Sequence, residues 1–362
     1  MMRVFTVIGA RPQFIKAAAV SAEIARRNGI EEILVHTGQH FDANMSDVFF
    51  DELGIPRPAR NLGIAGGSHG AMTGRMLEAL ESAMMEEVPD WVLVYGDTNS
   101  TVAGALAAAK LHIPLAHVEA GLRSFNKRMP EEINRILTDH CADLLFSPTP
   151  VATRNLAHEG IEGSKVLQVG DVMYDAARIF GARAARSSAI LKQNELRPGA
   201  YVLATLHRQE NTDDPARLMA IIEGLARVAE TLPVVLPLHP RTRKMLAATD
   251  TRLEAVRLRM IDPVGYLDMA ALEKGAVVIA TDSGGVQKEA YFHGVPCVTL
   301  RDETEWVELV EAGWNQLCPP NDAEAVSRAV LLAIGTIGRP IELYGAGDAS
   351  AKVLNALLSS SF

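Results

Sequence analysis

The chain has 362 residues, too many for one ordinary hydrophobic core, and its length predicts two α/β domains. A formal net charge of -9, with no dense run of lysine and arginine, argues against a protein that works on nucleic acid or on an anionic membrane. Three cysteines without metal-ligand spacing predict neither a disulfide framework nor a metal site. The first strand begins almost at Met1 and no apolar run reaches membrane-spanning length, so we expect a cytoplasmic protein.

Short apolar runs alternate with Ala- and Leu-rich stretches through the first half of the chain. This rhythm is typical of a doubly wound parallel sheet. The expected strands are 4–8, 33–36, 91–95, 115–118 and 144–147. Each run ends in unusual residues, such as Gly-Ala-Arg-Pro at 9–12 and Gly-Asp-Thr at 96–98. Because ligands bind beyond the carboxyl ends of parallel strands, we expect these residues to line one rim.

A second series of strands follows in the second half of the chain. Its expected members are 201–205, 234–237, 260–261, 277–280 and 296–300. The two series predict an α/β fold of two Rossmann-like, doubly wound domains that face each other across a cleft. We place the first domain at 1–170 and the second at 171–344, with a final helix, 345–362, that returns to the first domain.

The stretch 282–289, Asp-Ser-Gly-Gly-Val-Gln-Lys-Glu, follows a short apolar run and leads into a predicted helix. The free N–H groups and positive dipole end of that helix, near Ser283, Gly284 and Gly285, are suited to hold a diphosphate. Glu289 lies about one helical turn further on, where a carboxylate is placed to accept both hydroxyls of a ribose. The stretch therefore favours a nucleoside diphosphate. The alternative is a glycine-containing helix start that binds nothing.

Several cofactor motifs are missing from the sequence. The first strand is followed by Gly-Ala-Arg-Pro and not by the Gly-x-Gly-x-x-Gly turn of dinucleotide-binding enzymes. Neither a Walker A motif nor a His-Glu-x-x-His motif occurs. Nicotinamide, ATP and zinc chemistry therefore lose support, and we expect no cofactor.

Four groups suited to proton transfer stand at strand ends or in the loops just beyond them: Asp97, Glu119, Glu131 and His207. Each has a structural alternative. Asp97 is also placed to cap the helix that follows it. Glu131 or the adjacent Glu132 could instead stabilise the N-terminus of its own helix by interacting with the helix dipole. Three carboxylates on one predicted rim make a shared catalytic role more plausible than three separate structural ones.

Cations accompany these acids. Arg11 ends the first strand and Lys16 follows within the next predicted helix, so both are placed to reach an anion. His207 and Arg208 end the first strand of the second domain, and His239 ends the next strand. The alternatives are a surface charge for Lys16 and hydrogen-bonded structural roles for the two histidines.

Six motifs in a fixed order carry a family resemblance. They are Gly-Ala-Arg-Pro-Gln-Phe-Ile-Lys at 9–16, Gly-Asp-Thr at 96–98, His-Val-Glu-Ala-Gly-Leu-Arg at 117–123, Pro-Glu-Glu-Ile-Asn-Arg at 130–135, His-Arg at 207–208 and the stretch 282–289. With them, the chain resembles the non-hydrolysing UDP-N-acetylglucosamine 2-epimerase family over nearly its whole length. The resemblance implies the two-domain glycosyltransferase-B-like fold and a homodimer.

The resemblance also implies roles for the residues above. Positions that match catalytic residues are Asp97, Glu119, Glu131 and His207. Positions that match substrate contacts are Arg11, Lys16, Arg208, Ser283, Gly284, Gly285 and Glu289. The implied reaction inverts C2 of a UDP-2-acetamido sugar from gluco to manno. UDP leaves C1, a carboxylate removes the C2 proton to give a 2-acetamidoglucal, and UDP adds back after reprotonation from the opposite face. Which carboxylate is base and which is acid stays open.

Departures from the family pattern bear on the substrate. The motifs at 37–50, 125–130 and 304–308 look more like the branch that acts on UDP-2,3-diacetamido-2,3-dideoxy-D-glucuronate. Lys127 and Arg128 are suited to the carboxylate of a uronate, and the alternative is a solvated loop pair. The allosteric site of bacterial members is matched by Gln39, His40, Arg75 and His239, but a second glutamine is replaced within 44–46, which weakens that match.

Other functions stay open at this point. The substrate alternative is UDP-N-acetylglucosamine, which would give UDP-N-acetylmannosamine. Further alternatives are a hydrolysing epimerase, a glycosyltransferase of the same fold and a non-catalytic UDP-sugar sensor. The favoured function is an isomerase on a surface-polysaccharide pathway such as lipopolysaccharide O-antigen synthesis.

Overall fold

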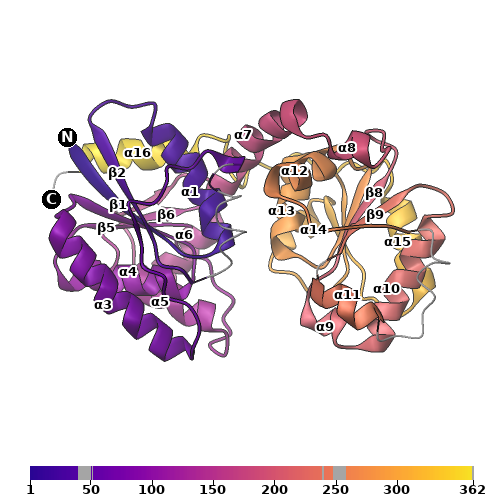
Figure 1. Cartoon of the computed structure of the whole chain (residues 1–362), viewed down its shortest axis with the longest axis horizontal. Coiled ribbons are helices and arrows are strands. Elements are labelled where there is room, and N and C mark those ends of the chain that lie inside the picture. The colour runs from indigo at the N-terminus through magenta and orange to yellow at the C-terminus, as the bar shows by residue number, and fades with distance from the viewer. Residues whose placement is uncertain (40–49, 51, 239, 248–257, 361–362) are drawn as a thin grey trace. The chain divides into compact units, whose positions relative to one another are not determined.

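The computed structural model describes residues 1–39, 50, 52–238, 240–247 and 258–360. The chain forms two compact units (Figure 1). Unit 1 comprises Met1–Ile179 and Glu342–Phe362, and unit 2 comprises Phe180–Ile341. Helix α7 (Val172–Ser187) begins in unit 1 and ends in unit 2, so the boundary between the units lies inside a helix and further along the chain than residue 170.

Unit 1 contains a seven-stranded sheet in the order β3-β2-β1-β4-β5-β6-β7, with every pair parallel. Its strands are β1 (Met2–Ile8), β2 (Ile30–His36), β3 (Arg60–Asn61), β4 (Trp91–Tyr95), β5 (Leu115–Val118), β6 (Leu144–Ser147) and β7 (Val166–Gln168). Its helices besides α7 are α1 (Arg11–Ile24), α3 (His69–Glu87), α4 (Asn99–Lys110), α5 (Pro130–Cys141), α6 (Pro150–His158) and α16 (Ala349–Ser359). The central strands are buried on both faces, as the apolar runs predicted.

Unit 2 contains a six-stranded parallel sheet in the order β10-β9-β8-β11-β12-β13. Its strands are β8 (Val202–Thr205), β9 (Val234–Pro237), β10 (Leu258–Ile261), β11 (Val278–Thr281), β12 (Cys297–Thr299) and β13 (Asn315–Leu317). Its helices besides α7 are α8 (Ile190–Gln193), α9 (Gln209–Thr212), α10 (Pro215–Val228), α11 (Pro240–Ala247), α12 (Tyr266–Gly275), α13 (Gly284–Phe292), α14 (Val307–Glu311) and α15 (Ala323–Ala333). The predicted α/β fold with two Rossmann-like sheets is confirmed.

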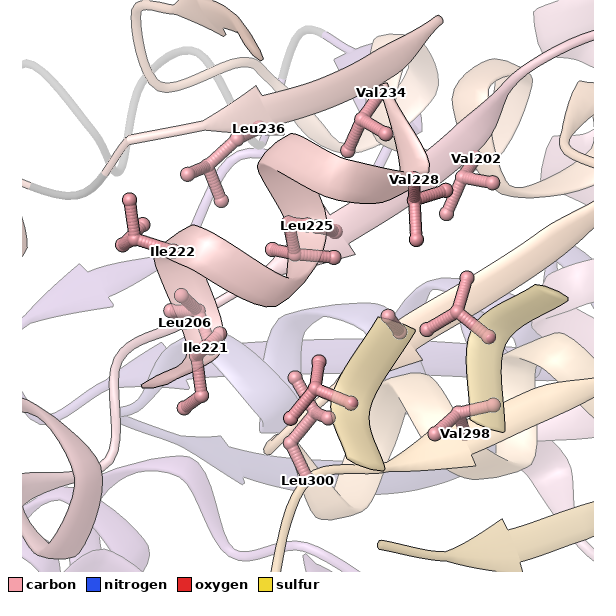
Figure 2. Close-up of a cluster of buried hydrophobic side chains, with 14 of the residues drawn as sticks. Val202, Leu206, Ile221, Ile222, Leu225, Val228, Val234, Leu236, Val298 and Leu300 are labelled. Atoms are coloured by element: carbon pink, nitrogen blue, oxygen red, sulfur yellow. The ribbon is translucent and has the colours of Figure 1, made fainter. Parts of the chain in front are cut away.

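The core of unit 2 shows how the sheet is held. Leu225 and Val228 of α10 belong to the same buried cluster as the strand residues Val234 and Leu236, and all four are fully buried (Figure 2). Helices α10 and α15 approach closely at Gly224, where an added Cβ would lie 2.7 Å from Val326 Cβ. Burial of aliphatic side chains of this size contributes roughly 1.5–3 kcal/mol each, so the sheet forms a rigid support for the loops at its carboxyl end.

Both sheets have a topological switch point. In unit 1, β1 pairs with β2 on one side and with β4 on the other. In unit 2, β8 pairs with β9 and with β11. Ligands of doubly wound sheets bind outside the carboxyl ends of the strands at such points. The segments that follow these strands are 9–16 and 96–98 in unit 1, and 207–208 and 282–285 in unit 2.

Candidate functional site

Asp97 lies in the turn between β4 and α4. Gly96 has a φ of 63°, and its N–H donates to the Val118 carbonyl oxygen at 3.0 Å, which ties the turn to the end of β5. Thr98 caps α4, since its side chain accepts from the N–H of Thr101 at 3.3 Å. The capping alternative for Asp97 is therefore wrong, and its carboxylate is available for another role.

Helix α5 contacts Asp97 with two side chains. Arg135 Nη1 donates to Asp97 Oδ2 at 2.8 Å, and Asn134 Nδ2 donates to the main-chain oxygen of Asp97 at 2.9 Å. Burial raises the pKa of Asp97 above its usual value, and the charges of Glu119 and Glu131 add to this effect. The positive charges of Lys16 and Arg135 oppose it. Asp97 thus shares its surroundings with two other candidate acids and two cations.

Glu119 follows β5 and forms an ion pair with Lys16 of α1. Only 11% of the Lys16 side chain and 9% of the Glu119 side chain are exposed, so Lys16 is not the surface charge of the alternative. The backbone of Glu119 has a φ of 76°, a conformation that L-residues rarely adopt and that is common at functional sites. The N–H of Glu119 and that of Ala120 both donate to the Phe146 carbonyl oxygen at 3.1 Å.

The two glutamates at the start of α5 have different surroundings. Glu132 is 1% exposed and accepts from the N–H groups of Ser124 and Phe125 at 2.9 and 2.8 Å. Arg135 Nη2 lies 3.0 Å from Glu132 Oε2. Glu131 is exposed, and its charge contributes to the raised pKa of Asp97. Of the pair, Glu132 therefore holds the loop before α5, and Glu131 is the exposed one.

Three predicted ligand contacts of unit 1 lie at its surface. Arg11 is half-buried at the first residue of α1. Lys127 and Arg128 are exposed in the loop that Glu132 holds, and the N–H of Arg128 donates to Asn126 Oδ1 at 3.1 Å. The structure thus places the two loop cations shortly before Glu131, on the loop that is tied to α5.

The predicted regulatory residues are only partly described. Gln39 Oε1 accepts from the N–H of Ser100 at 3.0 Å and from its Oγ at 2.7 Å, at the start of α4. Arg75 of α3 is exposed and donates to the Gly66 carbonyl oxygen at 2.6 Å. His40 and His239 lie outside the described residues.

In unit 2, Asp282 organises the residues after β8. Its fully buried carboxylate accepts from the N–H of His207 at 3.2 Å and from the N–H of Arg208 at 3.1 Å. Asn211 Nδ2 donates to the same carboxylate at 3.2 Å, and His207 Nδ1 lies 3.3 Å from Asp282 Oδ1. The His207 side chain is 49% exposed, so about half of it is accessible from outside the unit.

The start of α13 has the form predicted for an anion site. Ser283 caps the helix by accepting from the N–H of Val286 at 3.4 Å, and Gly284 and Gly285 form the first turn. The carboxylate of Glu305 lies beside Gly284, since a Cβ added there would overlap Glu305 Oε1. An anion of the chain itself therefore borders the helix start.

Cations and an aromatic ring surround Glu305. Arg301 Nη1 lies 2.8 Å from Glu305 Oε2, and Arg208 Nη2 lies 3.7 Å from Glu305 Oε1. Trp306 Nε1 donates to the Gly284 carbonyl oxygen at 2.8 Å, and Lys288 Nζ lies 4.4 Å from the centre of the Trp306 ring. Positive charge thus accumulates around the first turn of α13.

Glu289 lies further along α13 and is 8% exposed. The hydroxyl group of Tyr266 donates to Glu289 Oε1 at 3.3 Å, which fixes one oxygen of the carboxylate. The helix thus carries, in sequence, a cap, two glycines at its start and an oriented carboxylate about one turn later.

Sequence reasoning did not single out Arg135, Asp282 and Glu305. Arg135 follows Glu132 by three residues in a predicted helix, a spacing that places both side chains on one face and could have indicated their pairing. Asp282 and Glu305 contact partners distant in sequence, which no local pattern reveals.

In the part of the chain that the structure describes, no helix is long and apolar enough to cross a membrane, and no three metal-ligating side chains gather into a group.

Comparison with known proteins identifies the family. A family model described as UDP-N-acetylglucosamine 2-epimerase matches residues 22–358. The chain belongs to this family. Its enzymes are isomerases, so the predicted enzyme class is confirmed together with the resemblance that indicated it.

Individual relatives agree over nearly the full chain. A UDP-2,3-diacetamido-2,3-dideoxy-D-glucuronate 2-epimerase of Pseudomonas aeruginosa is 54% identical over 98% of this chain and 99% of the relative. The crystal structure of the UDP-N-acetylglucosamine 2-epimerase of Methanocaldococcus jannaschii with UDP-N-acetylglucosamine and UDP has a TM-score of 0.86 at 40% identity, covering 99% of this chain and all of that one. The Neisseria meningitidis enzyme bound to UDP-N-acetylglucosamine has a TM-score of 0.85 at 31% identity, covering 99% and 100%.

Proposed function

We propose that this protein inverts C2 of UDP-2,3-diacetamido-2,3-dideoxy-D-glucuronate, by elimination of UDP to a 2-acetamidoglucal and re-addition. The grouping of Asp97, Glu119 and Lys16 at the switch point of unit 1 is the observation that carries the reaction class. The 54% identity to the Pseudomonas aeruginosa 2-epimerase supports the substrate. The main alternative substrate is UDP-N-acetylglucosamine, because less similar relatives are named UDP-N-acetylglucosamine 2-epimerases.

The chemistry explains why several acids are needed. The C2 proton of a nucleotide sugar is weakly acidic, because no carbonyl group adjoins it, so departure of UDP from C1 must lead. Inversion then requires that a proton leaves from one face of the ring and returns to the other. We assign these transfers to Asp97, Glu119 and Glu131. The positive charges of Lys16 and Arg135 oppose the rise in the pKa of Asp97 and so favour its ionised form, which suits a base.

Stabilisation of the departing diphosphate is the task of unit 2 in this proposal. The capped start of α13 at Ser283, Gly284 and Gly285 presents N–H groups to an anion. Arg208 pairs with Glu305, whose carboxylate lies beside Gly284 in this first turn. Glu289, oriented by Tyr266, is assigned to the ribose hydroxyls. We assign His207 to the stabilisation of the departing diphosphate. Arg11 is assigned to substrate binding.

Proton NMR in heavy water tests the reaction. We expect deuterium at C2 with the UDP linkage retained, faster with the diacetamido-glucuronate than with UDP-N-acetylglucosamine. Asp97→Asn, Glu119→Gln and Glu131→Gln should each lower exchange by at least roughly a hundredfold. Free sugar with UDP would indicate a hydrolysing epimerase, and binding without any exchange would point to a transferase or a sensor.

The uronate assignment has its own test. Replacing Lys127 and Arg128 together by glutamine should raise KM for the uronate roughly tenfold, about 1.4 kcal/mol, because a charge-assisted contact is lost. The matched substrate, UDP-N-acetylglucosamine, has no carboxylate, so its KM should stay within about twofold. An equal effect on both substrates would show that the loop cations do not read the carboxylate.

We further propose that the protein acts as a homodimer in the cytoplasm. Met129, just before α5, and Ile133 and Leu137 on the helix are spaced four residues apart and are 39%, 46% and 43% exposed. Exposed apolar side chains on one face of a helix are typical of an interaction surface. Light scattering after size exclusion should give a dimer for the wild type and a monomer for the Ile133→Glu, Leu137→Glu variant. A monomeric wild type would contradict the proposed dimer. Cell fractionation tests the proposed location, and we expect the protein in the cytoplasmic fraction.

A further inference from the structure

His117 and Asp139 form a buried pair next to the turns that carry Asp97 and Glu119, and no step above uses it. His117 lies on β5 and Asp139 on α5, and both side chains are 0% exposed. His117 Nδ1 lies 2.7 Å from Asp139 Oδ1, and Nε2 lies 2.8 Å from the Gly96 carbonyl oxygen. One imidazole ring thus connects α5 to the residue immediately before Asp97.

Both ring nitrogens of His117 face acceptors. The Gly96 carbonyl oxygen only accepts, and Asp139 Oδ2 already lies 2.7 Å from Arg123 Nη1 and 3.1 Å from the Gly121 N–H. The ring therefore bridges two oxygens on its opposite sides, Asp139 Oδ1 of α5 and the main-chain oxygen of Gly96.

The groups around the pair favour an ionised Asp139. Burial raises the pKa of Asp139, but hydrogen bonds from His117 and the charge of Arg123 more than offset it and hold the pKa below its usual value. Arg123 also pairs with Glu159 at 2.7 Å. Arg123 therefore contacts the carboxylates of both Asp139 and Glu159.

Asp139 also brackets Glu119. Its Oδ1 contacts the ring of His117, two residues before Glu119, and its Oδ2 accepts from the N–H of Gly121, two residues after it. Glu119 itself has a left-handed φ of 76°, a conformation that strains a residue with a side chain. Such a conformation persists only where its surroundings fix it on both sides, as Asp139 does here.

We propose that His117 and Asp139 are positioning residues for the epimerisation, which together fix the turns of Asp97 and Glu119 relative to each other. The inference rests on the proposed roles of those two carboxylates. Transfers on opposite faces of C2 demand a fixed placement of the two groups, and a displacement of about 1 Å can cost about a hundredfold in rate. The pair acts through these turns and makes no contact with substrate itself.

Two substitutions test the proposal. In His117→Gln, a single NH₂ group replaces two opposed ring nitrogens and cannot reach both acceptors. In Asp139→Asn, one of the two oxygens that bracket Glu119 becomes an amide nitrogen. The matched control is His158→Gln, at the exposed end of α6. For each variant we would measure kcat and KM, UDP affinity by calorimetry, and folding by circular dichroism.

We expect kcat to fall ten- to a hundredfold in both variants, with KM and UDP affinity within about twofold of wild type. A purely structural role would instead lower the folded fraction and leave kcat per folded molecule unchanged. Folded variants with kcat within about threefold of wild type would therefore overturn the proposal. No C2 exchange in the wild type would overturn the proposed function, and this inference with it.

A measurement on the wild type covers the case in which the variants do not fold. Nitrogen-15 NMR of histidine-labelled protein detects ring N–H groups that are held in hydrogen bonds. We expect the ring N–H of His117 that faces Gly96 to exchange slowly with solvent and to show a through-space contact with Gly96. Rapid exchange of this N–H, or no contact with Gly96, would overturn the proposal.

Discussion

Arg135 is the side chain that joins Asp97 to Glu132: its guanidinium lies 2.8 Å from Asp97 Oδ2 and 3.0 Å from Glu132 Oε2. One cation therefore serves a candidate catalytic acid and the acid that holds the loop before α5. The two roles can be separated, because the two acids differ in pKa: that of Asp97 is raised and that of Glu132 is lowered.

Replacing Arg135 by glutamine should move the ionisation of Asp97 to higher pH. Burial already raises the pKa of Asp97, and Arg135 is one of two cations that oppose this rise, so its loss raises the pKa further. The limb of the pH–rate profile that reports Asp97 should shift upward in pH. Arg154→Gln, an exposed change on α6, is the control. A profile that stays in place or moves to lower pH would show that Arg135 does not set this ionisation.

Gly284→Ala should weaken UDP binding with little effect on folding. An added Cβ would overlap Glu305 Oε1, but the Glu305 side chain is 44% exposed and has room to move away. We expect the free energy of unfolding to change by less than about 1 kcal/mol. The methyl group would occupy space beside the N–H groups of α13, so calorimetry should give a UDP affinity at least roughly tenfold weaker. Gly70→Ala, where an added Cβ meets nothing within 4 Å, is the control, and unchanged affinity in Gly284→Ala would disprove the site.

Glu132→Gln should change the acid sensitivity of folding. Burial alone would raise the pKa of Glu132, but the N–H groups of Ser124 and Phe125 and the charge of Arg135 hold it below 4.5. A lowered folded-state pKa contributes stability that is complete above pH 4.5 and is lost as pH falls through the folded value.

The variant should therefore lose about 1–3 kcal/mol at pH 7 and show a shallower decline on acidification. Urea unfolding at pH 7 and at pH 4 measures both effects. Glu162→Gln, an exposed change in the loop after α6, should leave the pH dependence of stability unchanged. A variant as stable as wild type at pH 7 would contradict the prediction.

Gly121→Ala should be severely destabilising, in contrast to Gly160→Ala. Gly121 has a φ of 82°, and an added Cβ would overlap the carbonyl oxygen of Ala152, which is backbone and has little freedom to move. Strain and overlap together should cost at least about 3 kcal/mol. Gly160 has a similar φ of 75° but meets nothing within 4 Å, so its substitution should cost about 1 kcal/mol. Equal losses by urea unfolding would mean that the contact with Ala152 is unimportant.

The sequence predicted the central strands because each is a short apolar run buried on both faces, as in Trp91–Tyr95. It missed β3, β7 and β13, which have two or three residues and carry no extended apolar run. The motif order indicated the family before any contact was known.

The site was predictable only in part, and the reason is physical. Capping by Ser283 and the glycines after it follow from local rules, so the start of α13 could be derived from the sequence. The left-handed backbone of Glu119 could not, because a glutamate carries no local signal for positive φ. The contacts of Asp282 with residues 207 and 208 depend on the pairing of β11 with β8, which only the assembled sheet provides.

Helix α16 gives unit 1 an unusual order of assembly. Val353, Leu354 and Leu357 are buried in unit 1, and Asp175 accepts from the N–H groups of Ala349 and Ser350 at 3.2 and 2.7 Å. Domains generally fold as they are synthesised, from the N-terminus onward. Unit 1 therefore includes a segment that is made after unit 2: on the ribosome, unit 2 can complete its fold before unit 1 does. The proposed proton-transfer residues would become functional only once translation has passed the end of α16.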